Sequence, residues 1–381
     1  MLTWRKLILS LTLAFFTLGA AGAQEPTKKQ PRPTVEVVFC LDTTGSMSGL
    51  IHAAKQKIWA ISNQISAGNP TPLVKVGLVA YRDRRDAYVT KVFDLTDDLD
   101  AIHGQLMGLK AVGGGDFPES VNQALHEAVT KISWSKDKKT LRMIFLVGDA
   151  PPHMDYPDDV KYPITCKLAV ERNIIINTVQ CGTHAATRKY WLDICKSAEG
   201  SYVQIDAQGG PVVTVATPFD AKLAAINLEI NKTQLVFGGR RIQEAAKLRL
   251  AKSGALPAAA QADRAAFTAR NNAAVAYDLL QKVKDGKVKL EDLKKDELPE
   301  ELKGKSLAEQ KAVLASIEKR RAELSKEAID LDKKRGAYIN KKLAENQKAG
   351  ARDGFDNQVL RILQTQAERV NIQYGANPKK K

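Results

Sequence analysis

A carboxylate and two hydroxyls directly follow an apolar run near the start of the chain. The run from Val35 to Leu41 is rich in β-branched residues, which predicts a strand buried on both faces, as in a parallel sheet. Asp42 ends this run, and Thr44 and Ser46 follow at alternate positions around a glycine that allows a tight turn. Oxygen ligands of these kinds suit a hard divalent cation such as Mg²⁺. The segment therefore predicts a metal site at the carboxyl end of a strand.

Two later segments carry acidic residues in similar settings. Gly113 to Ser120 is a glycine-rich turn that contains Asp116 and leads into an amphipathic helical pattern. Met143 to Gly148 is another apolar run, and Asp149 follows it directly. Because loops of this kind can converge on one edge of a sheet, we expect Asp116 and Asp149 to lie near the first segment. For the first segment taken alone, an ordinary Ser/Thr/Asp helix cap is the alternative.

The order of these parts resembles that of the von Willebrand factor A (VWA) family. That family has a metal-ion-dependent adhesion site (MIDAS) with the pattern Asp-x-Ser-x-Ser, then a Thr, then an Asp. Asp42, Thr44 and Ser46 match its first element, with Thr in place of the first Ser. Asp149 matches the last element, whereas Asp116 stands at the position of the Thr. The resemblance implies that these five residues surround a metal ion.

The resemblance covers residues 34–205 and implies an α/β fold, a doubly wound and mostly parallel sheet. The domain is expected over 34–208, followed by an all-α, partly coiled-coil region over 211–381. Further strands are expected over 74–81, 87–93, 174–180 and 202–205, and helices over 160–173 and 187–198. Residues 82–86 carry so much charge that they predict only a hairpin turn.

Asp116 gives the predicted site three carboxylates in place of two. The additional negative charge should tighten cation binding and weaken the attraction of the bound cation for an incoming carboxylate. The ion expected is Mg²⁺, with Mn²⁺ or Ca²⁺ as alternatives. The resemblance implies a protein partner whose Asp or Glu completes the metal shell. With Asp116 present, a neutral or weakly acidic partner group, or a purely structural ion, is the alternative.

The first 23 residues predict export. Two basic residues precede an apolar run from Leu7 to Leu18, and Ala21 to Ala23 form a small-residue cleavage site before Gln24. This pattern is typical of a secretory signal peptide, and an uncleaved membrane anchor is the alternative. Residues 24–33 predict a disordered lead-in. We therefore expect a periplasmic or secreted protein of an exported bacterial type.

Export makes disulfides permissible for the four cysteines. Cys166 and Cys181 are expected to form a disulfide, because one begins a helix and the other ends a strand near the same edge. Cys40 and Cys195 are expected in the core. The sequence contains no Cys-x-x-Cys motif, and its five histidines are scattered, so it predicts no zinc site.

From residue 211 the composition shifts to Lys, Ala, Glu, Leu and Gln. Helices are expected over 219–232, 242–252, 261–284, 307–349 and 355–372. In the fourth helix a half-polar column that includes Arg321 and Arg335 runs beside an apolar heptad column, which predicts a helical hairpin or a weak coiled-coil seam. This region holds 34 Lys and Arg against 22 Asp and Glu, so it carries most of the formal net charge of +15.

The basic helices could contact an anionic surface, and the alternative is a solvated face with ion pairs along each helix. Aromatic residues are few and not interleaved with the lysines, so no nucleic acid is expected. Three functions follow for the whole chain. The first is an exported metal-dependent adhesion or scaffold module, and the second is a structural helical protein with a non-binding VWA domain.

The third function is an enzyme that forms an aspartyl-phosphate. The segment from Asp42 to Ser46 is similar to the Asp-Lys-Thr-Gly-Thr motif of haloacid-dehalogenase-type ATPases. Thr43 replaces the Lys of that motif, no cap domain is apparent, and Gly113 to Ser120 would have no role. We therefore expect a binding protein that is not an enzyme.

Overall fold

The computed structural model describes residues 32–207, 215–271, 277–348 and 355–374. The predicted signal peptide and most of the predicted lead-in lie outside the described residues. Among the helices that are described, none combines the length and the apolar composition that a membrane crossing requires.

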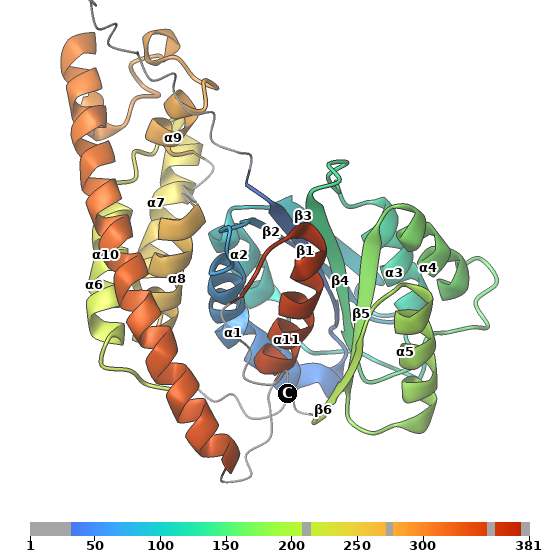
Figure 1. The fold of residues 1–381 in the computed structure, drawn as a ribbon. Helices are drawn as coiled ribbons and strands as arrows, with labels where there is room; N and C mark the ends of the chain where they lie inside the picture. The colour runs from blue at the N-terminus through green and yellow to red at the C-terminus, as the bar shows by residue number, and fades with distance from the viewer. Residues whose placement is uncertain (1–31, 208–214, 272–276, 349–354, 375–381) are drawn as a thin grey trace, which may run out of the picture. The chain divides into compact units, whose positions relative to one another are not determined.

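Six strands of the described chain form one sheet in the order β3-β2-β1-β4-β5-β6 (Figure 1). Neighbouring strands are parallel except for the antiparallel pair β2 and β3. The strand order reverses between β1 and β4, so the carboxyl ends of these two strands border the crevice where open α/β sheets bind ligands. The strands are β1 (Thr34–Asp42), β2 (Leu73–Tyr81), β3 (Thr90–Thr96), β4 (Thr140–Gly148), β5 (Ile174–Cys181) and β6 (Tyr202–Ile205).

Helices cover both faces of the sheet, which confirms the predicted fold class (Figure 1). One face packs against α1 (Ser48–Ser66), α2 (Leu99–Gly108) and α11 (Phe355–Ala367). The other face packs against α3 (Val121–Thr130), α4 (Tyr162–Glu171) and α5 (Ala185–Ser197). Because both faces are buried, β1 and β4 can be continuous apolar runs.

Helix α11, near the end of the chain, belongs to the core of this sheet. Its Leu363 is fully buried in the same cluster as β1 and α1. Gln366 and Asn177 of β5 exchange two buried hydrogen bonds of 2.7 and 3.0 Å between their side-chain amides. The helix predicted over 355–372 therefore completes the layer formed by α1 and α2.

The remaining helices are α6 (Asp220–Lys232), α7 (Arg240–Gly254), α8 (Ala258–Asn271), α9 (Leu279–Lys284) and α10 (Leu307–Lys348). Helix α10 packs against α6 and α8, and α8 also packs against α1. The polar heptad column of α10 points inward to buried partners. Arg321 pairs with Asp278 at 2.6 Å, and Arg335 pairs at 2.7 Å with both Asp220 of α6 and Asp263 of α8.

The structure differs from the expectations in several elements. The single helix predicted over 261–284 is two helices, because α8 ends at Asn271 and α9 begins at Leu279, and β4 begins at Thr140, three residues before the predicted run. Helix α2 was not predicted, although Leu99, Ile102 and Leu106 recur at helical spacing and the Asp98 side chain accepts from the Ala101 N–H at its start. Strand β3 begins at Thr90, three residues later than predicted, because Arg82 to Tyr88 form a longer loop at the carboxyl end of β2.

The predicted disulfide between Cys166 and Cys181 is wrong. All four cysteines lie in the described chain, and each is buried as a thiol. Cys181 points from β5 into the layer of α1 and α11, whereas Cys166 lies in the layer of α3 to α5. The sheet separates them, and the alternation of side chains along β5 sets that direction. Cys40 and Cys195 are in the core as expected.

Candidate metal centre

Asp42 ends β1 as a fully buried carboxylate with one oxygen bonded and one unpaired. Its Oδ1 accepts hydrogen bonds from the Thr44 backbone N–H at 2.9 Å and from the Thr44 hydroxyl at 2.6 Å. The Thr44 hydroxyl also lies 3.3 Å from the hydroxyl of Ser46, which is exposed. The other carboxylate oxygen of Asp42, Oδ2, is buried and has no hydrogen-bond partner among the described residues. Burial, and then the charge of Asp149, raise the pKa of Asp42 to about 7.

Asp149 follows β4 at the neighbouring strand end and is partly exposed. Gly148 lets the two strand ends come together, because a Cβ there would lie 3.3 Å from Asp42 Oδ2 and 2.4 Å from the Tyr81 hydroxyl. The hydroxyl of Thr187 donates to the Asp149 carbonyl at 2.7 Å and fixes the start of the loop. The structure thus brings Asp42, Thr44 and Ser46 together, with Asp149 close enough to affect Asp42 electrostatically.

Glu119 is an acidic residue of this site that the sequence analysis missed. Its side chain is buried, and its Oε2 has no hydrogen-bond partner within the described part of the chain. Gly114 has φ +85° and lies against both Thr44 and Glu119, since a Cβ there would be 3.2 Å from Thr44 Cβ and 3.3 Å from Glu119 Oε1. Burial, followed by the charges of Asp42, Asp83, Asp86 and Asp149, raises the pKa of Glu119 to about 9.

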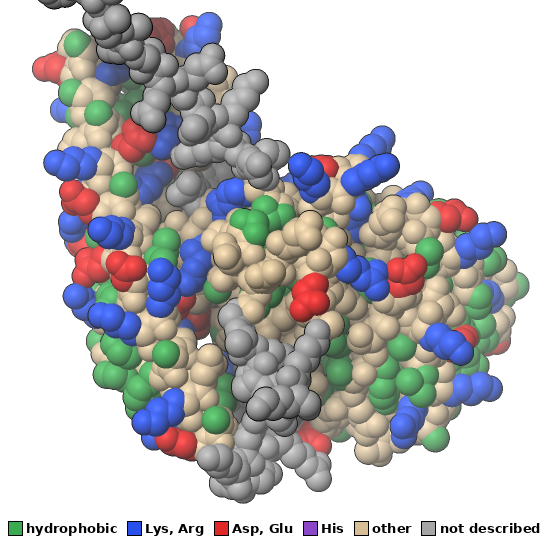
Figure 2. Space-filling view, in the orientation of Figure 1, with side chains coloured by type: hydrophobic (Ala, Val, Ile, Leu, Met, Phe, Trp, Pro, Cys, Tyr) green, Lys and Arg blue, Asp and Glu red, His purple; other side chains and the backbone are tan. Residues whose placement is uncertain are grey.

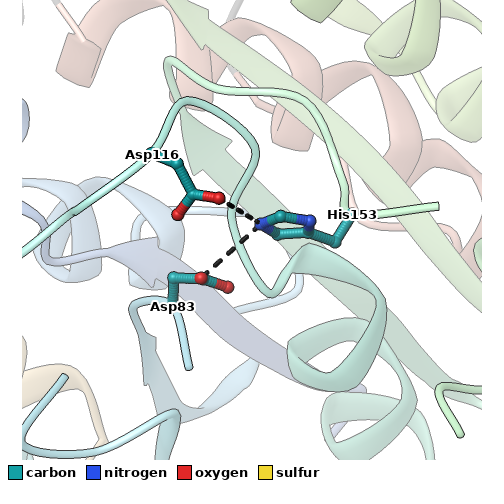
Figure 3. A group of neighbouring side chains, drawn as sticks. All are labelled: Asp83, Asp116 and His153. Carbon is teal, nitrogen blue, oxygen red and sulfur yellow. Dashed lines mark ion pairs between the residues drawn. The ribbon is translucent and has the colours of Figure 1, made fainter. Parts of the chain in front are cut away.

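The sequence does contain a signal for Glu119, because it is a second carboxylate in the glycine-rich turn and stands just before α3 begins at Val121. The sequence analysis assigned the family position to the other carboxylate of this turn, Asp116. The structure places Asp116 at the surface, where 65% of its side chain is exposed. Its Oδ2 lies 3.8 Å from His153 Nε2 and groups with Asp83 rather than with Asp42 (Figure 3).

Backbone hydrogen bonds join the glycine-rich turn to all three neighbouring strand ends. The Gly45 N–H donates to the Gly113 carbonyl at 3.1 Å, beside β1, and the Ser120 N–H donates to the Arg82 carbonyl at 3.2 Å, after β2. The Glu119 N–H donates to the Pro151 carbonyl at 2.9 Å, and its own carbonyl accepts from the His153 N–H at 3.1 Å, after β4. The turn is therefore positioned by the sheet rather than by its own sequence.

The donor set at Asp42 fits a hard divalent cation. A buried carboxylate oxygen without a donor is costly, and both Asp42 Oδ2 and Glu119 Oε2 are in that state when only the described protein atoms are counted. The nearby Arg82 guanidinium does not relieve either oxygen, because it donates to the carbonyls of Thr43 and Lys110. Carboxylates and hydroxyls are the ligands that Mg²⁺ and Ca²⁺ prefer.

Asp83 and His153 were also missed, and each had been given another role. Asp83 lies in the charged segment that was interpreted as a hairpin turn, and His153 was one of the scattered histidines. Their approach depends on two loops meeting across the strand ends, and this is not visible in residue spacing.

A doubly wound sheet with acidic residues at its switch point defines a class of ligand-binding α/β domain. Residues 36–217 match the family described as von Willebrand factor A domain. The human von Willebrand factor A domain-containing protein 7 is 35% identical over 120 residues, which are 32% of this chain and 12% of that protein. An ariadne-like RING finger protein of Acanthamoeba polyphaga mimivirus is 22% identical over 199 residues, 48% of this chain and 19% of that protein.

The chain thus spans about a fifth or less of the length of these relatives. Solved structures were also matched at low similarity. The SpRpn10 VWA domain is 17% identical with a TM-score of 0.36, over 48% of this chain and all of that one. Proximal thread matrix protein 1 from the mussel byssus, with a zinc-occupied MIDAS motif, is 15% identical with a TM-score of 0.36, over 46% of this chain and 42% of that one. From the family match and the fold, the chain contains a VWA domain.

Proposed function

We propose that the VWA domain of this chain is a metal-dependent protein-binding module, and that the protein is an exported adhesion or scaffold component rather than an enzyme. The observation that supports this proposal is the pair of buried carboxylate oxygens on Asp42 and Glu119, which face no donor in the described structure. Both belong to the switch-point crevice between β1 and β4, the usual ligand position of this fold.

Four residues of the predicted set would hold the ion, and Glu119 would join them. Asp42, Thr44, Ser46 and Asp149 come from the loops after β1 and β4, and Glu119 comes from the glycine-rich turn. A divalent cation bound here supplies a Lewis-acidic position that a partner's oxygen ligand can fill. Ser46 is exposed, so the site is open to such a ligand from the solvent.

The negative charge of the site affects which ligand group a partner can offer to the metal ion. Glu119 provides the third carboxylate that the sequence analysis had assigned to Asp116. With Asp42, Glu119 and Asp149 ionised around it, a divalent cation is more than neutralised, and its attraction for an incoming carboxylate is reduced. A weakly acidic or neutral oxygen ligand on the partner, such as an amide or hydroxyl, therefore fits better than a free carboxylate.

The charge on the surface of the helical region is mixed rather than purely basic. On the face in Figure 2, acidic side chains are interspersed with Lys and Arg over α10. Ion pairs such as Lys222–Glu327 at 2.9 Å and Lys311–Glu291 at 3.0 Å account for part of this pattern. These pairs favour a solvated helix face, and contact with an anionic surface remains the weaker of the two alternatives.

The test uses the chain from Gln24, immobilised and exposed to the exported protein fraction with Mg²⁺ or with chelator. We expect the wild type to capture a partner only with Mg²⁺, and Asp42→Asn to lose both Mg²⁺ binding in calorimetry and capture. Asp97→Asn removes an exposed acid outside the site and serves as the matched control. Equal capture with Mg²⁺ and with chelator would contradict the proposal.

A further inference from the structure

We infer that the protein has a second metal site of a different chemical kind, formed by His153 Nε2 and the carboxylates of Asp83 and Asp116. It would take a borderline transition-metal ion, of which Zn²⁺ is the reference case. The inference does not rest on the proposed function, because none of these three residues holds the ion proposed at Asp42.

The three ligand atoms already lie at nearly the spacing that a metal ion requires. His153 Nε2 is 3.5 Å from Asp83 Oδ2 and 3.8 Å from Asp116 Oδ2, and all three ligand atoms lie within 4.8 Å of one another. Ligands about 2.1 Å from a tetrahedral ion are about 3.4 Å apart. Figure 3 shows both carboxylates pointing toward the same ring nitrogen from separate loops. Small side-chain movements would close the remaining gap.

His153 is the observation that distinguishes this group from an ordinary acidic cluster. Its side chain is buried, and its Nε2 points at the two carboxylates without a hydrogen-bond partner among the described residues. Its other nitrogen, Nδ1, lies 2.8 Å from Asp155 Oδ1. A carboxylate that accepts from Nδ1–H leaves Nε2 with its lone pair free for a metal, which is the usual arrangement around metal-binding histidines.

The surrounding side chains hold the ligands in place. The Asp83 carboxylate is buried and accepts from the Ser120 hydroxyl at 2.9 Å and the Tyr156 hydroxyl at 2.8 Å. The His153 ring stacks on Tyr156 with the ring centres 4.0 Å apart and 11° between their planes. The Arg84 guanidinium lies over the other face of the stack, 3.9 Å from the Tyr156 ring centre. Two of the three ligands are thus oriented before an ion binds.

The donor set selects a different ion from the site at Asp42. One imidazole nitrogen and two carboxylates suit Zn²⁺ and its neighbours, whereas all-oxygen sets suit Mg²⁺ and Ca²⁺. Three protein ligands leave one position of a tetrahedral ion for water or for a ligand atom from outside. Asp116 is the exposed member, so that position would face the solvent.

The metal-free alternative is that His153 only contacts the three carboxylates around it, and the experiment must separate the two. The chain from Gln24, stripped of metal, is titrated with Zn²⁺ by calorimetry in excess Mg²⁺, and with Co²⁺ by visible absorption. We expect the wild type to bind one Zn²⁺ and to give Co²⁺ bands. His153→Ala should bind at least about 100-fold more weakly and lose the bands. His52→Ala removes an exposed histidine elsewhere and should behave as the wild type.

A second variant tests the inference even if His153→Ala does not fold. Asp155 is 72% exposed, so Asp155→Asn should fold normally and still weaken Zn²⁺ binding by about 10-fold. Asp42→Asn should keep Zn²⁺ binding while it loses Mg²⁺, which separates failure of this inference from failure of the proposed function. A wild type that binds no Zn²⁺ in excess Mg²⁺, or equal Zn²⁺ binding by His153→Ala and wild type, would overturn the inference.

Discussion

Asp42 and Glu119 are carboxylic acids whose environment favours the protonated form until a cation is present. Their pKa values in the folded metal-free protein are about 7 and about 9, above the usual 3.8 and 4.5. A carboxyl group with a raised folded pKa stabilises the fold fully below its unfolded pKa, and this contribution is lost as pH rises through the folded pKa. The window for these two groups is therefore about pH 4 to 9.

We expect the chelated protein to lose several kcal/mol of unfolding free energy from this pair as the pH rises from 5 to 9, with Glu119 contributing the larger part because its folded pKa is the higher of the two. Urea unfolding across that range measures it. Glu119→Gln should flatten the upper part of the profile, because the amide cannot ionise. The difference between wild type and variant isolates Glu119 from the other titrating groups, and parallel profiles would show that Glu119 is not shifted.

Variants of Asp116 and Glu119 should affect metal binding at different sites. Glu119→Gln should weaken Mg²⁺ binding by about 1–3 kcal/mol and leave Zn²⁺ binding nearly unchanged. Asp116→Thr should do the reverse, because Asp116 lies with His153 rather than with Asp42. Calorimetry with each ion on each variant gives four results. Weaker Mg²⁺ binding by Asp116→Thr would show that the Asp116 side chain serves the site at Asp42 after all.

Among the elements, α11 packs in the core of the sheet although it is distant from the strands along the chain. Leu363 is fully buried against the sheet, so Leu363→Ala should lower the unfolding free energy by about 2–5 kcal/mol. Leu248 of α7 is 57% exposed, and Leu248→Ala should change it by less than about 0.5 kcal/mol. Denaturant unfolding compares the two. Equal small effects would mean that α11 is not part of the core in solution.

The strands and most helices could be predicted because local residue patterns determine them. β1 and β5 are apolar runs bounded by polar residues, and their ends fall within one residue of the expected positions for that reason. The position of α11 could not be predicted, because an amphipathic pattern shows that one face is buried but not which surface covers it. Asp42, Thr44 and Ser46 could be identified from the sequence because they form one continuous motif.

The rest of the candidate site could not be identified from the sequence, because it depends on contacts between loops that are distant along the chain. Glu119 reaches Thr44 only through the backbone pairing of the glycine-rich turn with the loops after β1, β2 and β4. His153 meets Asp83 across two of those loops. No spacing in the sequence encodes these distances, since each loop is positioned by a different strand.

Across the whole molecule, a buried polar network connects the sheet layer to the long helix. Arg335 of α10 pairs with Asp220 and Asp263, and Asn63 of α1 donates to Asp263 at 3.2 Å and to Asp332 at 3.1 Å. Replacing the arginine leaves buried carboxylates without their counter-charge. The network therefore specifies which surface of α10 faces α6, α8 and α1.

Arg335→Leu should accordingly lower the unfolding free energy at pH 7 by about 3–5 kcal/mol. Arg320→Leu, in the same helix but at an exposed ion pair, should cost less than about 1 kcal/mol. The deficit of Arg335→Leu should shrink at pH 4, because burial raises the pKa of Asp263 and this carboxylate, once it has lost its arginine, can take up a proton there. Thermal unfolding of the three proteins at both pH values checks this, and equal losses in the two variants would contradict it.

The packing of α11 also has a consequence for synthesis. A ribosome releases β1 and α1 well before α11, and the face of the sheet that they share with Leu363 stays uncovered until α11 has emerged. During that interval the nascent chain exposes an apolar surface, of the kind that chaperones recognise and that promotes aggregation. Completion of the native core must therefore wait until α11 has been synthesised, and premature termination before α11 should yield chains that are removed by proteolysis rather than truncated proteins that accumulate.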